Sequence, residues 1–150
     1  MKIKNVNPRD LNKIVNLEQK IFKKNAFSKN LIEKLIQNNN FFLKLEIGKI
    51  RNQLIGFIIG IKDKKDRVNI INFLIKPKFQ NKGYGSYLLQ KAIDEVKKSM
   101  EIKKIVLNVQ LSNSTAIKLY EKFNFKRDPT ILENYYQSGE SAYLYRLFIN

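Results

Sequence analysis

The stretch from Asn72 to Leu89, NFLIKPKFQNKGYGSYLL, constrains the fold of this chain more than any other. An apolar run ends at Pro77, a glycine-containing segment follows, and an amphipathic pattern typical of a helix then begins. The stretch therefore predicts a strand, a tight loop and a helix. Gly83 and Gly85 let the backbone approach a ligand closely, and the free N–H groups of the first helical turn favour an anion such as a phosphate.

The loop has the form Q-x-x-G-x-G, from Gln80 to Gly85. It matches neither the dinucleotide fingerprint G-x-G-x-x-G nor the Walker loop G-x-x-x-x-G-K-[ST], so neither a nicotinamide nor a nucleoside triphosphate is the expected ligand. Taken alone, the loop is also compatible with a strand-to-helix turn whose glycines only relieve strain. The later segments decide between these two interpretations.

The absence of cysteine and histidine narrows the chemistry that the chain can perform. It excludes thiol nucleophiles, thiolate zinc sites, imidazole bases and Ser-His triads, and no metal site is expected. The 29 Lys and Arg exceed the 13 Asp and Glu and give a net charge of +16. Such a charge draws a protein toward nucleic acid, the ribosome, acidic peptides or a phosphorylated cofactor. A codon bias toward A and T, which enriches Lys, Asn and Ile, is the competing cause, and the scattered lysines favour it.

The chain length of 150 residues predicts one domain, residues 1–150. The longest apolar stretch, Leu54 to Ile61, is far shorter than the ~20 residues that span a bilayer, and no apolar segment follows Met1. We therefore expect a soluble, cytoplasmic protein with no membrane partner.

The apolar patterns predict about four helices and a mixed, mostly antiparallel sheet. The expected strands are Ile3 to Val6, Phe41 to Ile47, Leu54 to Lys62, Val68 to Ile75, Lys104 to Gln110 and one near the chain end. The expected helices follow Asn7, Ser28 and Asn113 or span Tyr84 to about Ser99, and a polar turn is expected over Lys62 to Asp66. The strands on either side of the Tyr84 helix should pair in parallel, because a helical crossover joins them. Ligands bind at the carboxyl ends of such strands.

One acid, Glu18, falls on the apolar face of the first expected helix. Two interpretations are open. Glu18 is either a boundary residue that reaches water, or a carboxylate held near a substrate entrance.

Two further segments carry patterns of their own. The run S-N-x-x-A-I-x-L-Y-E-K-x-x-F, which includes Asn113 and Tyr120, reads as a capped helix, and an isolated Tyr there would be a core residue. The run N-Y-Y-x-x-G-E-x-A begins at Asn134. Together with the glycine loop, these runs resemble the GNAT N-acetyltransferases over the whole chain, and in particular the branch that acetylates the α-amino groups of ribosomal proteins and nascent chains.

The resemblance implies an α/β fold (α+β by some schemes) with one parallel strand pair at the cofactor site. It also implies direct acetyl transfer from acetyl-CoA to an amine. The implied cofactor-binding residues are Phe73, Leu74 and Ile75, whose backbone holds the pantetheine arm, and Gln80, Asn81, Lys82, Gly83, Tyr84, Gly85, Ser86 and Asn113.

The same resemblance assigns Tyr120 as the general acid that protonates the departing thiolate. It places Phe27, Tyr135 and Tyr136 in the walls of the substrate pocket, since Ala26-Phe27-Ser28 stands where that branch often has Pro-Trp-Ser. Without the resemblance, the adjacent tyrosines would read as surface aromatics.

The chain departs from the family pattern at the catalytic base. Relatives carry Glu or His at the position of Asn108, and some use the position of Asn69. Asparagine cannot take a proton, although it can hold a water that passes one on. Three possibilities follow: a distant carboxylate such as Glu18 or Glu46 acts through water, the amine arrives neutral from solution, or the protein binds acetyl-CoA without efficient catalysis.

The expected acceptor is the free α-amino group of a peptide or protein N-terminus, with the ribosome as a further candidate partner and no specific nucleic acid. The alternative enzyme is a GNAT that acts on a Lys side chain, a polyamine or another small amine. The alternative that is not an enzyme is a basic RNA- or ribosome-binding module.

Overall fold

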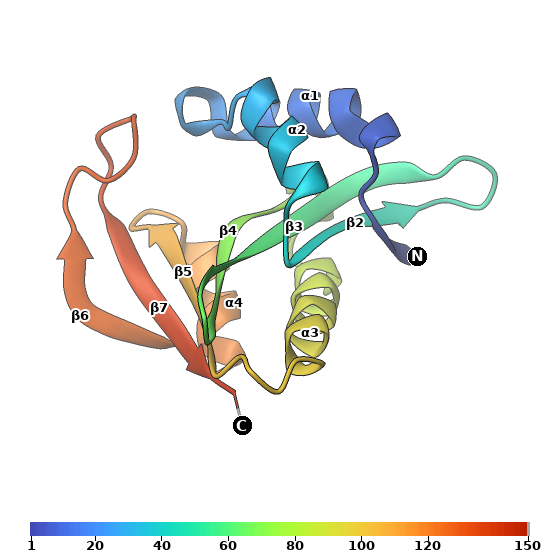
Figure 1. Ribbon diagram of the computed structural model, residues 1–150. Helices are drawn as coiled ribbons and strands as arrows, with labels where there is room; N and C mark the ends of the chain where they lie inside the picture. Colours follow the sequence, from blue (N-terminus) through green and yellow to red (C-terminus); the bar gives the residue numbers. More distant parts are fainter. Residues whose placement is uncertain (150) are drawn as a thin grey trace.

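The computed structural model describes residues 1–149 as a seven-stranded sheet with helices on both faces (Figure 1). The strands are β1 (Lys2–Asn5), β2 (Phe41–Ile47), β3 (Gln53–Lys64), β4 (Arg67–Ile75), β5 (Lys104–Gln110), β6 (Lys126–Leu132) and β7 (Ala142–Phe148). The helices are α1 (Leu11–Phe22), α2 (Lys29–Gln37), α3 (Tyr84–Lys97) and α4 (Ser114–Lys122), with short 3-10 turns η1 (Pro8–Asp10), η2 (Lys23–Asn25) and η3 (Pro77–Phe79). The expected α/β architecture with four helices is confirmed.

The strand order is β1-β2-β3-β4-β5-β7-β6, and β4 with β5 is the parallel pair. All other described pairs are antiparallel, as predicted. The pairing of β4 with β5 ends at Ile70 and Leu107, although β4 continues to Ile75 and β5 to Gln110. The two strands therefore separate at their carboxyl ends and leave a gap in the middle of the sheet.

A β-bulge marks the point where β4 leaves β5. Asn72 pairs with Ile59 of β3 and Ile70 with Gly60, so Ile71 is an extra residue. Ile71 packs in the core beneath α1 and α2, and Asn72 hydrogen-bonds to a side chain of α1. Both residues therefore point to the same face of the sheet, next to the gap.

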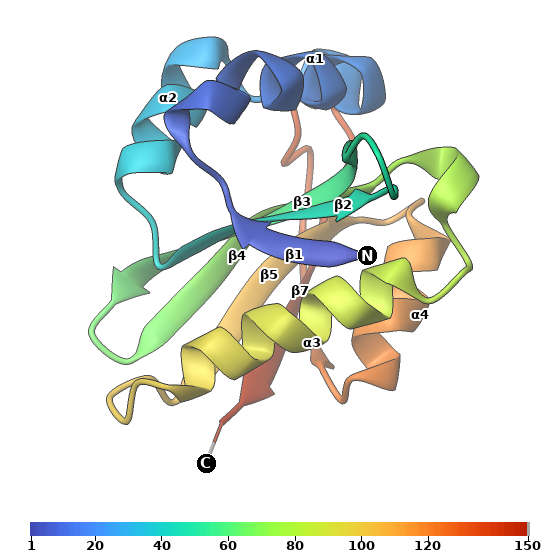
Figure 2. The ribbon, with the colours of Figure 1, turned by 90° about the vertical axis from the view of Figure 1, so that its right-hand side faces the viewer.

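Two hydrophobic cores hold the helices to the sheet. The core beneath α1 and α2 contains Ile14, Ile32 and Phe57, and the core beneath α3 and α4 contains Leu89 and Ile105. Figure 2 shows α1 and α2 on one face of the sheet and α3 and α4 on the other. The helices therefore cover both faces of the middle of the sheet, while β6 at its edge stays largely exposed.

Two expected helix starts have the side-chain caps that their sequences suggest, because Ser28 caps α2 and Asn113 caps α4. Asn7 caps the 3-10 turn η1 by accepting from the Arg9 N–H, whereas Asp10, the residue before α1, makes no side-chain cap bond. Each cap satisfies a backbone donor that would otherwise lack a partner at the helix start. The starts of these helices are thus fixed by local sequence.

The structure corrects several expected boundaries. β1 spans Lys2–Asn5 instead of Ile3 to Val6, and α3 ends at Lys97 instead of near Ser99. β3 continues to Lys64, which shortens the expected polar turn to two residues. Strand β6 was not expected, because its sequence KRDPTIL has no apolar alternation. Among residues 1–149, no helix is long and apolar enough to cross a membrane.

Candidate active site

A cleft of about 290 Å³ lies where β4 ends, between the loop before α3 and the helix α4. Its lining includes nine of the residues expected to bind a cofactor: Phe73, Leu74, Ile75, Gln80, Asn81, Gly83, Gly85, Ser86 and Asn113. Two expected residues, Lys82 and Tyr84, do not line it, and the ring of Tyr84 packs against Phe79 with the centroids 6.1 Å apart. The glycine loop and α4, far apart in sequence, thus form one cleft.

The loop has a backbone shape that leaves its N–H groups free. Asn81 and Gly83 have positive φ angles of 60° and 90°, and the Gln80 side chain fixes the loop to β4 by donating to the Ile75 carbonyl at 2.9 Å. Tyr87 donates the first helical bond, to the Gly83 carbonyl. The N–H groups of the first turn of α3 have no partner among the described residues and are available to an anion.

The two glycines face the cleft. A Cβ built on Gly83, which lines the cleft, would meet no atom within 4 Å. A Cβ on Gly85 would lie 3.3 Å from Leu119 and 3.8 Å from Ile75 and Phe73, so a side chain there would fill the space between β4 and α4. The loop thus leaves room for a ligand that larger residues would remove.

The free edge of β4 offers two backbone groups to the cleft. Lys76 donates to the Ile55 carbonyl on β3, so by alternation Phe73 and Ile75 turn their main-chain groups away from β3. The Phe73 N–H is bound by the Asn72 side chain at 2.9 Å, and Gln80 binds the Ile75 carbonyl. The Phe73 carbonyl and the Ile75 N–H remain for an extended ligand that carries amide groups.

Two lysines of α4, Lys118 and Lys122, line the cleft, and Lys76 directly follows Ile75, which also lines it. The pKa of Lys76 is lowered by burial and then by the nearby charges of Lys20 and Lys78. A polyanion would relieve this repulsion. Free helical N–H groups, an open strand edge and lysines together fit an elongated ligand with an amide arm and a phosphate end.

Tyr120 lies where this cleft reaches the gap in the sheet. Its ring packs against Phe73, Phe125 and Tyr145 with centroids 6.3, 5.7 and 6.3 Å apart. Among residues 1–149 its hydroxyl has no hydrogen-bond partner. Burial, and to a lesser extent Tyr136, raises the pKa of Tyr120, so the hydroxyl stays protonated at neutral pH. Tyr120 is part of the core and also presents a free proton donor to the gap.

A second, smaller cavity of about 90 Å³ lies on the other side of Tyr120, toward α1. It shares Phe22, Phe73, Asn113 and Tyr120 with the cleft. A groove of about 800 Å³ continues from it to the surface, and the two share Asn25, Phe27 and Tyr136. We call the small cavity the inner cavity and the groove the outer groove. The cleft, the inner cavity and the outer groove are therefore neighbours in this order, and Tyr120 lines both the cleft and the inner cavity.

The roof of the inner cavity joins two segments that are far apart in sequence. Asn25 and Ser138 exchange two hydrogen bonds, at 3.2 and 3.0 Å, between the α1–α2 connection and the β6–β7 connection. Tyr136 lines the inner cavity, and its ring stands edge-on to Tyr135 at 5.0 Å. Phe27 lies in both the inner cavity and the outer groove. The three aromatic residues expected around a substrate therefore come together.

Asn108 projects into the inner cavity with one polar atom unsatisfied. Its neighbours Leu107 and Val109 face the core under α3 and α4, so Asn108 faces α1. Its Nδ2 donates to the Tyr135 hydroxyl at 2.9 Å, while Oδ1 is the buried side-chain polar atom without a partner among residues 1–149. The other candidate base position, Asn69, lies outside the cavity, where its Nδ2 donates to Asp63 at 3.2 Å.

Glu18 of α1 is fully buried and lines the inner cavity. It is therefore not a boundary residue that reaches water, and its carboxylate lies at the inner cavity. One oxygen accepts from the Phe27 N–H at 2.8 Å and the other from Nδ2 of Asn72 at 2.5 Å. Burial raises the pKa of Glu18 to about 7, against the lowering effect of the two hydrogen bonds.

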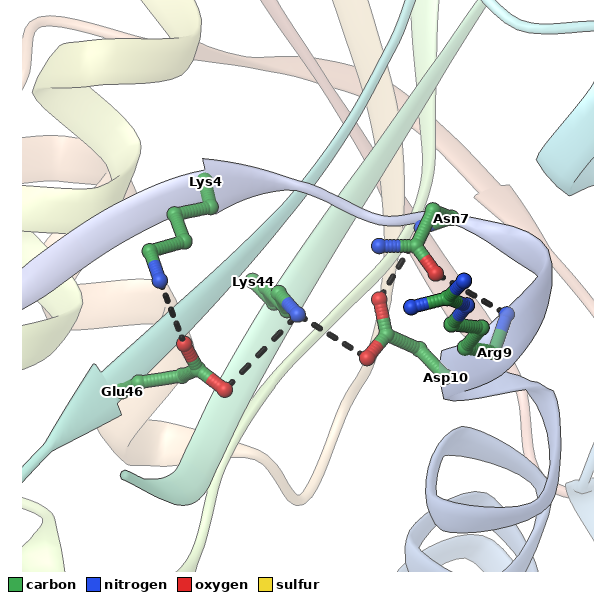
Figure 3. A network of polar contacts seen from close by, with 6 residues as sticks. All are labelled: Lys4, Asn7, Arg9, Asp10, Lys44 and Glu46. Carbon is green, nitrogen blue, oxygen red and sulfur yellow. Dashed lines mark hydrogen bonds and ion pairs between the residues drawn. The ribbon is translucent and has the colours of Figure 1, made fainter. Parts of the chain in front are cut away.

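Glu46, the other distant carboxylate considered as a base, belongs to a separate ion-pair network (Figure 3). Its oxygens lie 3.7 Å from Nζ of Lys4 and 3.7 Å from Nζ of Lys44, and Lys44 contacts Asp10 at 2.9 Å. This network joins β1 and β2 to the 3-10 turn before α1, and Glu46 lines none of the three cavities.

The raised pKa of Glu18 predicts a pH-dependent stability. The folded state holds this proton more tightly than the unfolded chain, so stability falls as pH rises from about 4.5 to about 7 and is then level. The difference should be about 3 kcal/mol relative to Glu18→Gln. The chain has no histidine, so few other groups titrate in this range. Urea unfolding of both proteins between pH 4.5 and 8 measures the effect, and parallel curves would contradict it.

Sequence reasoning missed three residues that shape the site: Asn72, Asn25 and Ser138. Asn72 is a polar residue in an otherwise apolar strand just before the glycine loop, which is a signal that could have singled it out. Asn25 and Ser138 are polar residues in polar loops, and nothing in the sequence links them.

Comparison with known proteins places this geometry in a family. Residues 11–125 match the model of the "Acetyltransferase (GNAT) family". An N-alpha-acetyltransferase of Sulfolobus acidocaldarius is 37% identical over 76 residues, which are 51% of this chain and 45% of that protein. An N-alpha-acetyltransferase of Saccharolobus solfataricus is 26% identical over 95% of this chain and 89% of its own length.

Solved structures share the fold. Arabidopsis thaliana NAA60 in complex with acetyl-CoA superposes with a TM-score of 0.86 at 17% identity, and the match covers 99% of both chains.

Proposed function

Because the chain belongs to the acetyltransferase (GNAT) family, whose members transfer acetyl groups, we propose that its acceptor is the free α-amino group of a peptide or protein N-terminus. Acetyl-CoA supplies the acetyl group as an activated thioester. Two named relatives, both N-alpha-acetyltransferases, support this choice of acceptor.

The residues of the cleft have separate tasks in this proposal. The free N–H groups at the start of α3 and the lysines of α4 bind the phosphates of acetyl-CoA. The Phe73 carbonyl and the Ile75 N–H pair with its amide arm as an added strand would. Tyr120 holds a proton at its hydroxyl for the departing sulfur.

The observation that carries the proposal is the meeting of the cleft and the inner cavity at Tyr120, between the separated strands β4 and β5. A donor entering on the α3 and α4 side and an amine entering on the α1 side meet at this point. The outer groove continues from the inner cavity, past Phe27 and Tyr136, with room for the residues that follow a chain terminus. The peptide that carries the acceptor amine can therefore stay on the α1 side of the sheet.

The protonation of amines favours an α-amino group over lysine. The pKa of an α-amino group is about 7.7 to 8.0, whereas the pKa of a Lys side chain is about 10.4. The gap of about 2.5 units makes the neutral amine about 300-fold rarer for lysine at the same pH.

We therefore expect peptides with a free N-terminus to be acetylated at least about 100-fold faster than the same peptides with a blocked N-terminus and an internal lysine. Mass spectrometry of the products, after incubation with acetyl-CoA at pH 7.5, locates the acetyl group. Acetylation mainly on internal lysine or on a polyamine such as spermidine would move the acceptor to that class of amine. A peptide panel that varies the first residue then defines the preference of the inner cavity.

A further inference from the structure

We propose that Glu18 is the proton acceptor of the acetyl transfer and that Asn108 holds the amine whose proton it takes. The inference builds on the proposed transfer to an amine. It does not depend on the identity of the acceptor, because any amine that reaches Tyr120 from the outer groove passes through the same inner cavity.

The contacts of Glu18 hold its carboxylate in place and leave it able to take a proton. Each oxygen accepts one hydrogen bond, from the Phe27 N–H and from Asn72. Each oxygen of a carboxylate has about two acceptor sites, so one site on each remains. The Glu18 side chain is therefore held by two segments, the α1–α2 connection through Phe27 and β4 through Asn72. Among residues 1–149, it is the one carboxylate that lines the inner cavity.

Asn108 supplies a hydrogen-bond acceptor that can hold the amine before the amine loses its proton. Its Oδ1 is buried in the inner cavity and has no partner, while Nδ2 is held by the Tyr135 hydroxyl. An unsatisfied buried acceptor of this kind is costly unless a donor joins it. The N–H of an amine is such a donor. Asn108 orients the nitrogen, and a cavity of about 90 Å³ has room for it beside a water, which takes about 30 Å³.

The proton that leaves the amine and the proton that reaches the sulfur are handled on opposite faces of the sheet. Glu18 and Asn108 lie on the α1 face, and Tyr120 comes from α4 on the other face. An N–H bond of the ammonium breaks, its electron pair stays on the nitrogen, and an O–H bond forms on Glu18. Glu18 then returns this proton to solvent. The nitrogen bonds to the acetyl carbon, the carbon–sulfur bond breaks, and the sulfur takes the proton of the Tyr120 hydroxyl. The second N–H proton, lost as the amide forms, restores that hydroxyl, so each turnover releases one proton.

The surroundings of Glu18 match an α-ammonium. Tyr120 of α4 and Tyr136 of the β6–β7 connection are the titratable groups that face it, and both keep their protons at neutral pH because burial raises their pKa. From β4 and β5 it meets uncharged Asn72 and Asn108. Burial raises the pKa of Glu18 to about 7. Proton transfer from an α-ammonium to such a group is unfavourable by about tenfold, but from lysine by more than ~10³.

The test compares wild type with Glu18→Gln and Glu46→Gln in kcat–pH profiles from pH 5.5 to 9. For wild type we expect kcat to rise with pH through an apparent pKa near 7. Glu18→Gln should lower kcat at pH 7.5 by about 10²-fold or more and lose this rise. Glu46→Gln replaces a buried glutamate of the separate ion-pair network and should keep both kcat and the rise.

A structural role for Glu18 predicts other results. If Glu18 only supports the structure, its replacement would loosen the roof of the inner cavity. KM for the acceptor would then rise, and kcat would still increase with pH. The double variant Glu18→Gln/Asn108→Glu restores a carboxylate to the same cavity, on β5 instead of α1, so we expect it to recover at least tenfold in kcat. A merely structural role predicts no recovery, and failure to recover counts against the proposal.

A second measurement does not require the variant to fold or the enzyme to turn over. NMR titration of wild type with ¹³C-labelled glutamate side chains should show one carboxyl group that titrates between pH 6 and 8. A chain without histidine gives this window few other titrations. The absence of such a carboxyl, or an unchanged kcat rise in Glu18→Gln, would overturn the proposal. If peptides are not acetylated but spermidine is, the acceptor proposal fails while the same profiles still test Glu18.

Discussion

Replacing Tyr120 with phenylalanine should lower kcat by about 10²- to 10⁴-fold and leave the affinity for acetyl-CoA near that of wild type. The hydroxyl has no hydrogen-bond partner among the described residues, so its removal leaves no buried group unpaired. The ring keeps its contacts with Phe73 and Phe125. Steady-state kinetics, calorimetric titration with acetyl-CoA and thermal unfolding together separate chemistry from binding and folding.

Tyr145→Phe is the matched control. Tyr145 is also fully buried and lies 6.3 Å from Tyr120, but its hydroxyl donates to Glu121 at 3.0 Å, and it lines none of the cavities. This variant should lose about 1 kcal/mol of stability and retain kcat. If Tyr120→Phe retains kcat as well, Tyr120 is a core residue and the sulfur receives its proton from another source.

The features that the sequence predicted well are local ones. The strand, loop and helix around Gly83 depend on neighbouring residues, and so do the caps at Ser28 and Asn113. The parallel pairing of β4 with β5 followed from one helical crossover. Tyr120 was singled out by its family motif, since its position on an apolar helical face also suits a core residue.

The features that the sequence did not predict depend on contacts between distant segments. Glu18 is buried because the Phe27 N–H and the side chain of Asn72, 54 residues away, satisfy its oxygens. The pattern around Glu18 was equally consistent with an exposed boundary residue. The roof of the inner cavity depends on Asn25 and Ser138, which are 113 residues apart.

Strand β6 shows the same limit for the fold. Its sequence contains Pro129 and no alternation of apolar residues, and its pairing with β7 is interrupted between Arg127 and Ile131. The strand is held by partners on β7, since Arg146 pairs with Asp128 at 2.9 Å and Arg127 lies over the ring of Tyr143 at 4.5 Å. Local propensity alone gives no strand here, and tertiary contacts override it.

Replacing Gly83 with valine should weaken acetyl-CoA binding at least 100-fold while the protein remains folded. The new side chain would meet no protein atom, because the Cβ position has none within 4 Å, but Gly83 lines the cleft directly before the free N–H groups of α3, where an added side chain competes with the phosphates. A β-branched residue also tolerates the φ angle of 90° poorly, so some loss of stability is expected. Calorimetric titration measures the affinity, and thermal unfolding checks the fold.

Gly139→Val separates the occupied space from the backbone strain. Gly139 has a φ angle of 88° and likewise no atom within 4 Å of a built Cβ, but it lies in the β6–β7 connection, outside the acetyl-CoA cleft. Both variants carry the same backbone strain, so their loss of stability should be similar. Only Gly83→Val should lose affinity for acetyl-CoA. Equal affinities for the two variants would mean that the loop before α3 does not hold the phosphates, and the anion would then bind elsewhere along the lysines of α4.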